Sequence, residues 1–249
     1  MAFRHLEDSV QESQENTDAY LSLFGDLKEP TRTVLAYTLD LATYLKSVGL
    51  QEDYMVFGGY AVLSHLMKTH GEGFAKLWRG SSDIDMAGTL NVLHAVKRGY
   101  SASSDFPSPN VTDKRTIKLT EDKEKECKID FYLGDRQALD ERFDKPEVNV
   151  HLGIPLNVVS PLRLIKGKLQ TPAEQPEHAI DVMSMLGVLQ GRGHTPQEII
   201  QYFDVADRPG FLARVIHGRD IISSHRIGAS PTGDFEGELI GLLKKLTQP

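Results

Sequence analysis

Two aspartates in the stretch RGSSDIDM are the first residues whose types and spacing could do chemistry. Asp83 and Asp85 stand two positions apart on a segment that alternates like a β-strand. Side chains two apart on a strand project from the same face, so both carboxylates could bind one divalent cation. Such a pair also arises by chance in a chain with 19 aspartates. Alone, it indicates either a metal site or two surface acids.

A third aspartate stands inside a second apolar segment, KECKIDFYLG. Asp130 lies there between Ile129 and Phe131. A buried carboxylate is costly unless it is paired or bound to a metal, which would make Asp130 a further metal ligand. The alternative is a surface-facing residue of an amphipathic strand. The residues themselves leave both interpretations open.

A glycine pair precedes the aspartates, between an apolar run and a helical pattern. The segment YMVF predicts a buried strand, and Gly58-Gly59 leads from it into apolar residues with helical spacing. Glycines there let backbone N–H groups approach an anion at the helix N-terminus, although a tight turn alone also favours them. Ser81 and Ser82 could likewise cap, or could offer hydroxyls to a phosphate. The pattern is neither a Walker A loop nor GxGxxG.

The elements that must position these residues fall into two groups. Residues 1–16 read as a polar arm, with helical signals from Thr17, and a helix follows that begins at Pro30 and ends just before Gly49. The predicted strands are YMVF, SDIDMAG, RTIKLTE, ECKIDFYLG and one or two in VNVHLGIPLNVV. Beyond Ser160-Pro161, the predicted helices are 161–170, 177–190, 196–206, 209–223 and 234–247. The sequence therefore predicts an α+β unit followed by a helical C-terminal unit.

Composition disfavours several classes of protein. The chain has 249 residues, 40% of them apolar, and no apolar run approaches the ~20 residues that span a membrane. The polar, acidic N-terminus predicts no secretory signal, and the single Cys127 indicates a reducing compartment. The net charge of −7 is carried by residues 1–159, unlike a protein that grips duplex DNA through its phosphates. We expect a soluble, cytoplasmic protein that does not bind duplex DNA.

Taken together, these motifs resemble the DNA polymerase β-like nucleotidyltransferase superfamily, and within it the AbiEii/MenT-type toxins and their uncharacterised relatives. Their pattern is a strand, Gly-Gly and a helix, then Arg-x-Ser-x-Asp-hydrophobic-Asp, matched here by VFGGYAVL and RGSSDIDM. A later Ser-Pro, Lys and Asp are matched by SPLRLIKGKL and HAIDVMSML. Relatives often have Lys-Asp where this chain has Glu177-His178. The resemblance covers residues 50–190.

The resemblance implies a mixed sheet flanked by helices and three parts: an N-terminal arm and first helix at 1–30, a catalytic domain at 31–159 and a helical domain at 160–249. It implies an enzyme that moves NMP from an NTP to an acceptor hydroxyl with two Mg²⁺ ions. The implied metal ligands are Asp83, Asp85 and Asp130, and Asp130 would also help to deprotonate the acceptor. The implied nucleotide-binding residues are Gly58, Gly59, Arg79, Ser81, Ser82, Lys166, Lys168 and Asp181.

The acceptor and the activity itself stay open at this stage. Relatives act on tRNA ends, proteins or small molecules, and a toxin would need a cognate antitoxin. A basic face for RNA could come only from arginines of the helical part: Arg192, Arg208, Arg214, Arg219 and Arg226. Trp78 could stack on a base or pack in a core. The second hypothesis is a catalytically silent nucleotide-binding or interaction module on the same fold.

Overall fold

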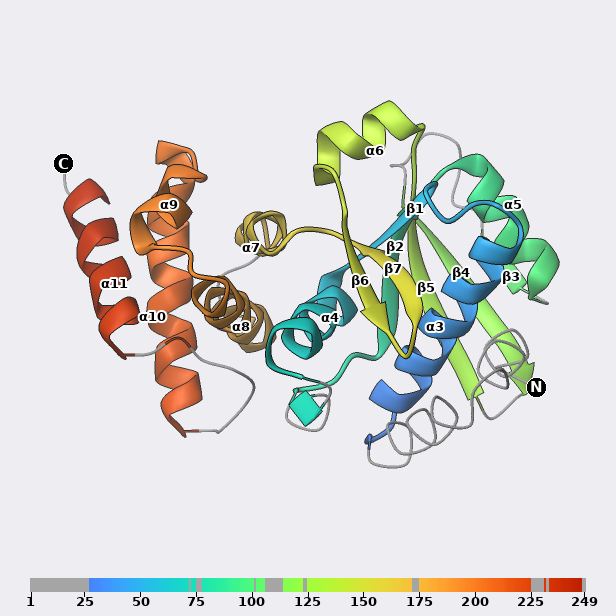
Figure 1. Cartoon of the computed structure of the whole chain (residues 1–249), viewed down its shortest axis with the longest axis horizontal. Helices are drawn as coiled ribbons and strands as arrows, with labels where there is room; N and C mark the ends of the chain where they lie inside the picture. Colours follow the sequence, from blue (N-terminus) through green and yellow to red (C-terminus); the bar gives the residue numbers. More distant parts are fainter. Residues whose placement is uncertain are drawn as a thin grey trace. The chain divides into compact units, whose positions relative to one another are not determined.

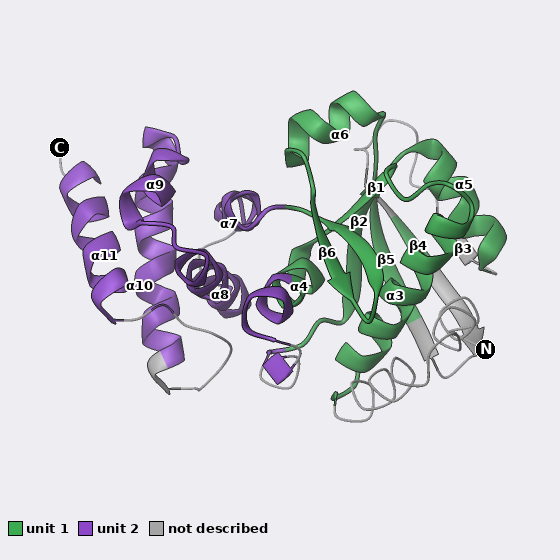
Figure 2. Ribbon diagram, viewed as in Figure 1, with its two compact units in different colours: residues 1–64, 80–159 green, residues 65–79, 160–249 purple. Residues whose placement is uncertain are grey.

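The structure is a computed structural model of the chain (Figure 1). It describes residues 27–71, 73–74, 78–100, 102–105, 114–122, 125–171, 175–224, 231 and 233–247. The chain divides into two compact units (Figure 2). The first comprises residues 1–64 and 80–159, and the second comprises residues 65–79 and 160–249. The helical signals predicted from Thr17 lie outside the described residues.

The first unit contains one mixed sheet with the strand order β3-β4-β5-β2-β1-β7-β6. The strands are β1 (Tyr54–Phe57), β2 (Asp83–Gly88), β3 (Ala102–Asp105), β4 (Lys114–Asp122), β5 (Lys125–Leu133), β6 (Glu147–His151) and β7 (Ile154–Val158). Strand β2 runs parallel to β5 and β1 runs parallel to β7, whereas the other neighbours are antiparallel. The predicted α+β class with a mixed sheet is confirmed, and VNVHLGIPLNVV supplies two strands.

Among the described residues, four helices accompany this sheet. They are α3 (Thr31–Ser47), α4 (Gly58–His70), α5 (Leu90–Gly99) and α6 (Arg136–Phe143). Helix α4 follows β1 directly, so the predicted strand-to-turn-to-helix order is confirmed; its residues from His65 onward belong to the second unit. Sequence analysis missed β3, α5 and α6. Helix α6 buries only Leu139 and Phe143, which is too few apolar residues for a visible helical period.

The sheet separates an apolar face from a polar one. Ile84 and Met86 of β2, like Ile129 and Phe131 of β5, are fully buried. Because side chains alternate along a strand, the aspartates between them project from the opposite face. Helices α3 and α5 both pack against β2. The alternating sequence therefore places one face of the central strands in the core, and the charged residues lie on the other face.

The second unit is helical in its described part. After the last turns of α4 it contains α7 (Pro161–Leu169), α8 (Pro176–Gly191), α9 (Pro196–Gln201), the 3₁₀ turn η2 (Val205–Asp207), α10 (Arg208–Ser224) and α11 (Gly233–Thr247). Thr195 and Glu198 form a capping box at the start of α9. The helix predicted at 196–206 ends early, because α9 stops at Gln201 and η2 follows. Within the described residues, no helix has the length and apolar content to cross a bilayer.

Candidate active site

Strand register brings the three predicted carboxylates onto one face of the sheet. Asp85 of β2 is directly opposite Asp130 of β5, and Asp83 is opposite Lys128. Cross-strand partners point to the same side, and so do residues two apart on one strand. Asp83, Asp85, Lys128 and Asp130 therefore form one registered group on the two central strands, which we call the carboxylate face.

Asp130 is buried with two polar partners. Its side chain is 7% exposed, and its Oδ1 lies 2.9 Å from the Lys128 ammonium. The Thr116 hydroxyl donates a hydrogen bond to the same oxygen at 3.2 Å. Because Asp130 is buried, the surface-facing alternative is wrong. The ammonium and the hydroxyl offset the cost of burying its carboxylate. Lys128 and Thr116 were missed by sequence analysis, although Lys128 stands two positions from Asp130 and so shares its face.

Gly58 lies directly against Asp85. Gly58 has φ of +65°, a left-handed conformation that favours glycine. A Cβ placed on Gly58 would also overlap the Asp85 carboxylate. This position therefore excludes any side chain for two separate reasons. The close approach places the Asp85 carboxylate at the first residue of α4, where backbone N–H groups have no partners within the helix.

The donor set fits Mg²⁺ in chemistry and in register. Carboxylate oxygens are the protein ligands that Mg²⁺ prefers, and the glycine turn leaves room for Asp85 beside α4. The side chains are not gathered into a metal cage, however. Among the described residues, no group of three His, Cys, Asp or Glu side chains converges closely enough to hold an ion. The Lys128 ammonium instead contacts Asp130.

A second charged cluster lies wholly in the helical unit. Asp181 of α8 is completely buried, and Arg79 donates two hydrogen bonds to its carboxylate, at 2.9 Å from Nε and 2.7 Å from Nη2. Lys168 of α7 lies 2.8 Å from the same carboxylate. Burial alone would raise the pKa of Asp181, but the charges of Lys168 and Arg79 outweigh it and hold that pKa below its ordinary value. We call Arg79, Lys168 and Asp181 the cation cluster.

His178 lies near the cation cluster, one turn before Asp181 on α8. Its Nδ1 lies 2.7 Å from the Thr171 hydroxyl. Burial, followed by the charge of Lys168, lowers the pKa of His178 to about 4. The imidazole is therefore neutral at pH 7. A neutral imidazole adds no charge to the cluster.

The remaining predicted site residues have contacts of their own. The Ser81 hydroxyl donates to the Asp83 carbonyl at 3.0 Å, and Ser82 is exposed. The Lys166 ammonium lies 3.0 Å from Asp204, near η2. These contacts neither establish nor exclude nucleotide binding, so the predicted roles of Ser81, Ser82, Lys166 and Gly59 stay predictions.

Two side chains singled out for other roles are buried. Arg214 is 2% exposed and donates to the Thr171 carbonyl at 2.6 Å, so it does not belong to a basic surface for RNA. Trp78 is 6% exposed, as expected for core packing. The predicted Arg226 lies outside the described residues. Without Arg214, any basic face of the helical unit is smaller than the sequence suggests.

A buried Ser–His contact in the first unit resembles a nucleophile and its base. Ser64 Oγ lies 2.7 Å from His151 Nε2, and the Asn149 amide donates to Ser64 at 2.9 Å. Ser64 and Asn149 are 0% exposed and His151 is 1% exposed. No substrate reaches a group so enclosed. The network instead joins the edge strand β6 to α4.

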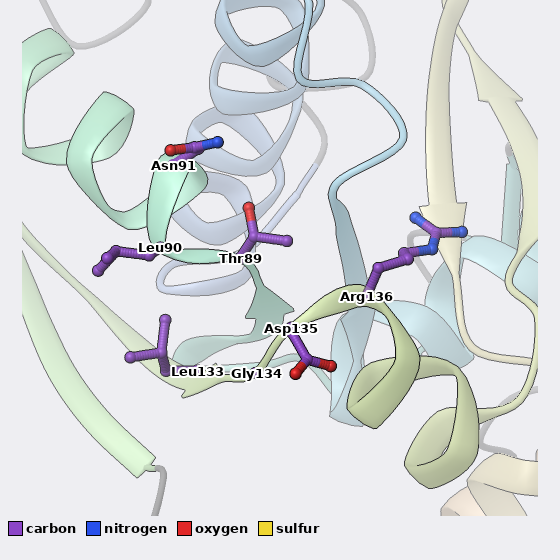
Figure 3. Close-up of a pocket in the computed structure, with 7 residues that line it drawn as sticks. All are labelled: Thr89, Leu90, Asn91, Leu133, Gly134, Asp135 and Arg136. Atoms are coloured by element: carbon purple, nitrogen blue, oxygen red, sulfur yellow. The ribbon is translucent and has the colours of Figure 1, made fainter.

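A pocket of about 480 Å³ opens where β2 and β5 end (Figure 3). Thr89 and Leu90 line it at the start of α5, and Leu133 and Arg136 line it before and at the start of α6. None of the predicted site residues lines this pocket. It is separate from the carboxylate face, and its walls are mostly apolar.

Comparison with known proteins leaves the family open. No protein-family model matches the chain, and no curated protein matches it. Among solved structures, the chain is similar to an antigenic nucleotidyltransferase-like protein from Paracoccidioides brasiliensis. The two share 15% identity over 82% of this chain and 96% of that chain, with a TM-score of 0.46. A likeness of this strength identifies neither a family nor an activity.

Proposed function

We propose that the protein is a Mg²⁺-dependent nucleotidyltransferase that moves NMP from an NTP to an acceptor hydroxyl. The observation that supports the proposal most is the carboxylate face. Asp83, Asp85 and Asp130 share one side of two paired strands, and Asp85 lies against the glycine that begins α4. Carboxylates beside a helix N-terminus suit a substrate that brings both a metal ion and phosphates.

The proposed reaction forms a bond between the acceptor oxygen and the α-phosphorus of the NTP, and pyrophosphate leaves. Asp83, Asp85 and Asp130 would hold the Mg²⁺ ions, which supply positive charge to the phosphates and to the acceptor oxygen. Asp130 would accept the proton of the acceptor hydroxyl. Backbone N–H groups at Gly58 and Gly59, with the Ser82 hydroxyl, would bind phosphate oxygens.

The cation cluster is proposed to bind phosphate as well. Arg79 and Lys168 both contact the Asp181 carboxylate, so the cation cluster has a net positive charge. Arg79 and Lys168 are 22% and 14% exposed, so parts of both side chains can reach solvent. Asp181 would then be a positioning residue that holds the two cations in place, and it need not touch the nucleotide.

A catalytically silent nucleotide-binding module is the second candidate. The ion pair between Lys128 and Asp130 favours it, since an ammonium contacts the proposed metal ligand. An AbiEii/MenT-type toxin with a cognate antitoxin is a narrower form of the first candidate. Its acceptor would be a tRNA end, a protein or a small molecule.

Two measurements test these proposals in order. Calorimetric titration with ATP, CTP, GTP and UTP, with and without Mg²⁺, should show Mg²⁺-dependent binding of at least one nucleotide. Incubation of the protein with each labelled NTP and a cell lysate should then place label on one class of acceptor. Binding without transfer would favour the silent module, and no binding of any NTP would contradict both candidates.

A further inference from the structure

Three aromatic rings gather beside the carboxylate face. Phe57 of β1 is the cross-strand partner of Asp85, and Tyr132 of β5 stands two residues beyond Asp130. Both rings therefore project from the same side of the sheet as the three carboxylates. The third ring, Phe143, comes from α6, which packs against β2. Phe57 and Phe143 stack with centroids 5.0 Å apart, and Tyr132 meets Phe57 edge-on at 5.3 Å.

An exposed arginine covers this ring cluster. The Arg142 guanidinium carbon lies 4.7 Å from the centroid of Tyr132 and 5.5 Å from that of Phe143. Within the described part of the chain, no carboxylate forms an ion pair with Arg142. Phe57 and Tyr132 are only half-buried, whereas Phe143 is 9% exposed. Arg142 itself is exposed, so its side chain is accessible to a ligand.

Packing of α6 explains part of this arrangement but not all of it. Phe143 anchors the helix, and the contact of Phe57 with Phe143 belongs to that anchor. Tyr132 is part-buried and Arg142 is exposed, and together they present a ring and a planar cation next to ionisable groups. Guanidinium planes and aromatic rings are surfaces on which nucleobases stack.

We propose that Tyr132 and Arg142 form a stacking platform for a nucleobase, either that of the NTP or that of a nucleotide at the acceptor end. The platform rests on the proposed function, because it gives the carboxylate face its neighbouring base subsite. Consecutive same-face residues on a strand are about 7 Å apart, so a base on the platform would lie within one nucleotide of Asp130. If the base on the platform is that of the acceptor, the acceptor class that fits is a single-stranded nucleic acid end.

The test compares ligands with and without a base. Mg²⁺-tripolyphosphate, Mg²⁺-ATP and a single-stranded oligoadenylate are titrated into wild type, Arg142→Ala, Arg142→Lys and the control Arg136→Ala. Arg136 lies on the same helix and pairs with Asp140 at 3.2 Å, so its loss changes the charge equally without touching the rings. Arg142→Ala should lower affinity for one base-containing ligand about tenfold and leave tripolyphosphate unchanged. Arg142→Lys should restore little of that loss.

The outcomes separate the possibilities. A loss confined to ATP assigns the platform to the base of the NTP, and a loss confined to oligoadenylate assigns it to the acceptor end. Unchanged affinity for both ligands, or full rescue by Arg142→Lys, overturns the platform while the proposed function stands. Failure of wild type to bind both Mg²⁺-tripolyphosphate and every Mg²⁺-NTP overturns the proposed function instead, and the oligoadenylate titration then decides the platform alone. Melting curves of all four proteins should differ little, since an exposed cation–π contact and an exposed ion pair each contribute little to stability.

Discussion

Two buried aspartates, Asp130 in the first unit and Asp181 in the second, differ in how far neighbouring cations neutralise them. Asp181 is completely buried and contacts two cations. Asp130 contacts the ammonium of one half-exposed lysine and shares its face with two further acids. The cation cluster therefore has a surplus of positive charge and the carboxylate face a surplus of negative charge. The first arrangement favours anions and a fixed carboxylate, and the second favours a divalent cation.

The largest expected effect comes from removing the charge of Asp130. Asp130→Asn should lower single-turnover transfer about 10²- to 10⁴-fold, because the acceptor hydroxyl loses its proton acceptor. NTP affinity should stay near wild type, since Asp83 and Asp85 remain. Asp140→Asn, in the same unit and at a side chain that is 43% exposed, serves as control. Transfer at the wild-type rate in Asp130→Asn would show that the acidic surplus has no catalytic role.

Removing the charge of Asp181 should lower the stability of the protein rather than slow the chemical step. Asp181→Asn leaves Arg79 and Lys168, which are only 22% and 14% exposed, without their carboxylate and mutually repelling, so the free energy of unfolding should fall by about 3 kcal/mol. Asp204→Asn breaks the Lys166 pair at a side chain that is 76% exposed, and should cost less than about 0.5 kcal/mol. Urea denaturation measures both. An equal loss of unfolding free energy in the two variants would mean that the buried ion pairs of Asp181 stabilise the protein no more than the exposed pair of Asp204.

Lys128 should lower the affinity of the carboxylate face for Mg²⁺, because its ammonium contacts Asp130. Lys128→Met should lower the metal-free unfolding free energy by about 1 kcal/mol, because the buried Asp130 loses its counter-ion at a partly exposed site. The same change should strengthen Mg²⁺ binding several-fold, since no ammonium competes for the carboxylate. Calorimetric Mg²⁺ titration and denaturation test both effects, with the exposed Lys145→Met as the charge-matched control. Weaker Mg²⁺ binding would show that Lys128 supports the site.

The smallest expected effect is a pH dependence from His178. Its pKa lies at about 4 in the folded protein, below that of an exposed histidine, because of burial and then Lys168. As the pH falls, His178 is protonated in the unfolded chain before it is protonated in the folded protein. The stability that the neutral ring contributes is therefore fully present above about pH 6.5 and is lost as the pH falls toward 4. His178→Gln should flatten this decline while retaining a side chain that can bond Thr171. Thermal melting of both proteins between pH 4 and 8 provides the measurement; parallel curves would assign the decline elsewhere.

Local patterns in the sequence predicted much of the fold and part of the site. Alternation identified the strands around Asp83, Asp85 and Asp130, and helical spacing identified the helices beyond Ser160. The glycine turn at the start of α4 was predicted from residue types alone, and the structure shows that a positive φ and a close approach both require glycine at Gly58. Helices α5 and α6 were missed. The seven-stranded order, with β2 between β5 and β1, also could not be read from the pattern.

By itself, the sequence determined that Asp83 and Asp85 share a face, because spacing within one strand is a local property. Only the tertiary structure decided that Asp130 stands opposite Asp85 with Lys128 beside it, since strand pairing depends on contacts between distant segments. The same holds for Asp181, whose partner Arg79 is 102 residues away in the chain. Residue types predict which groups can carry charge, but the degree to which each charge is buried and neutralised arises from packing, and that balance separates the carboxylate face from the cation cluster.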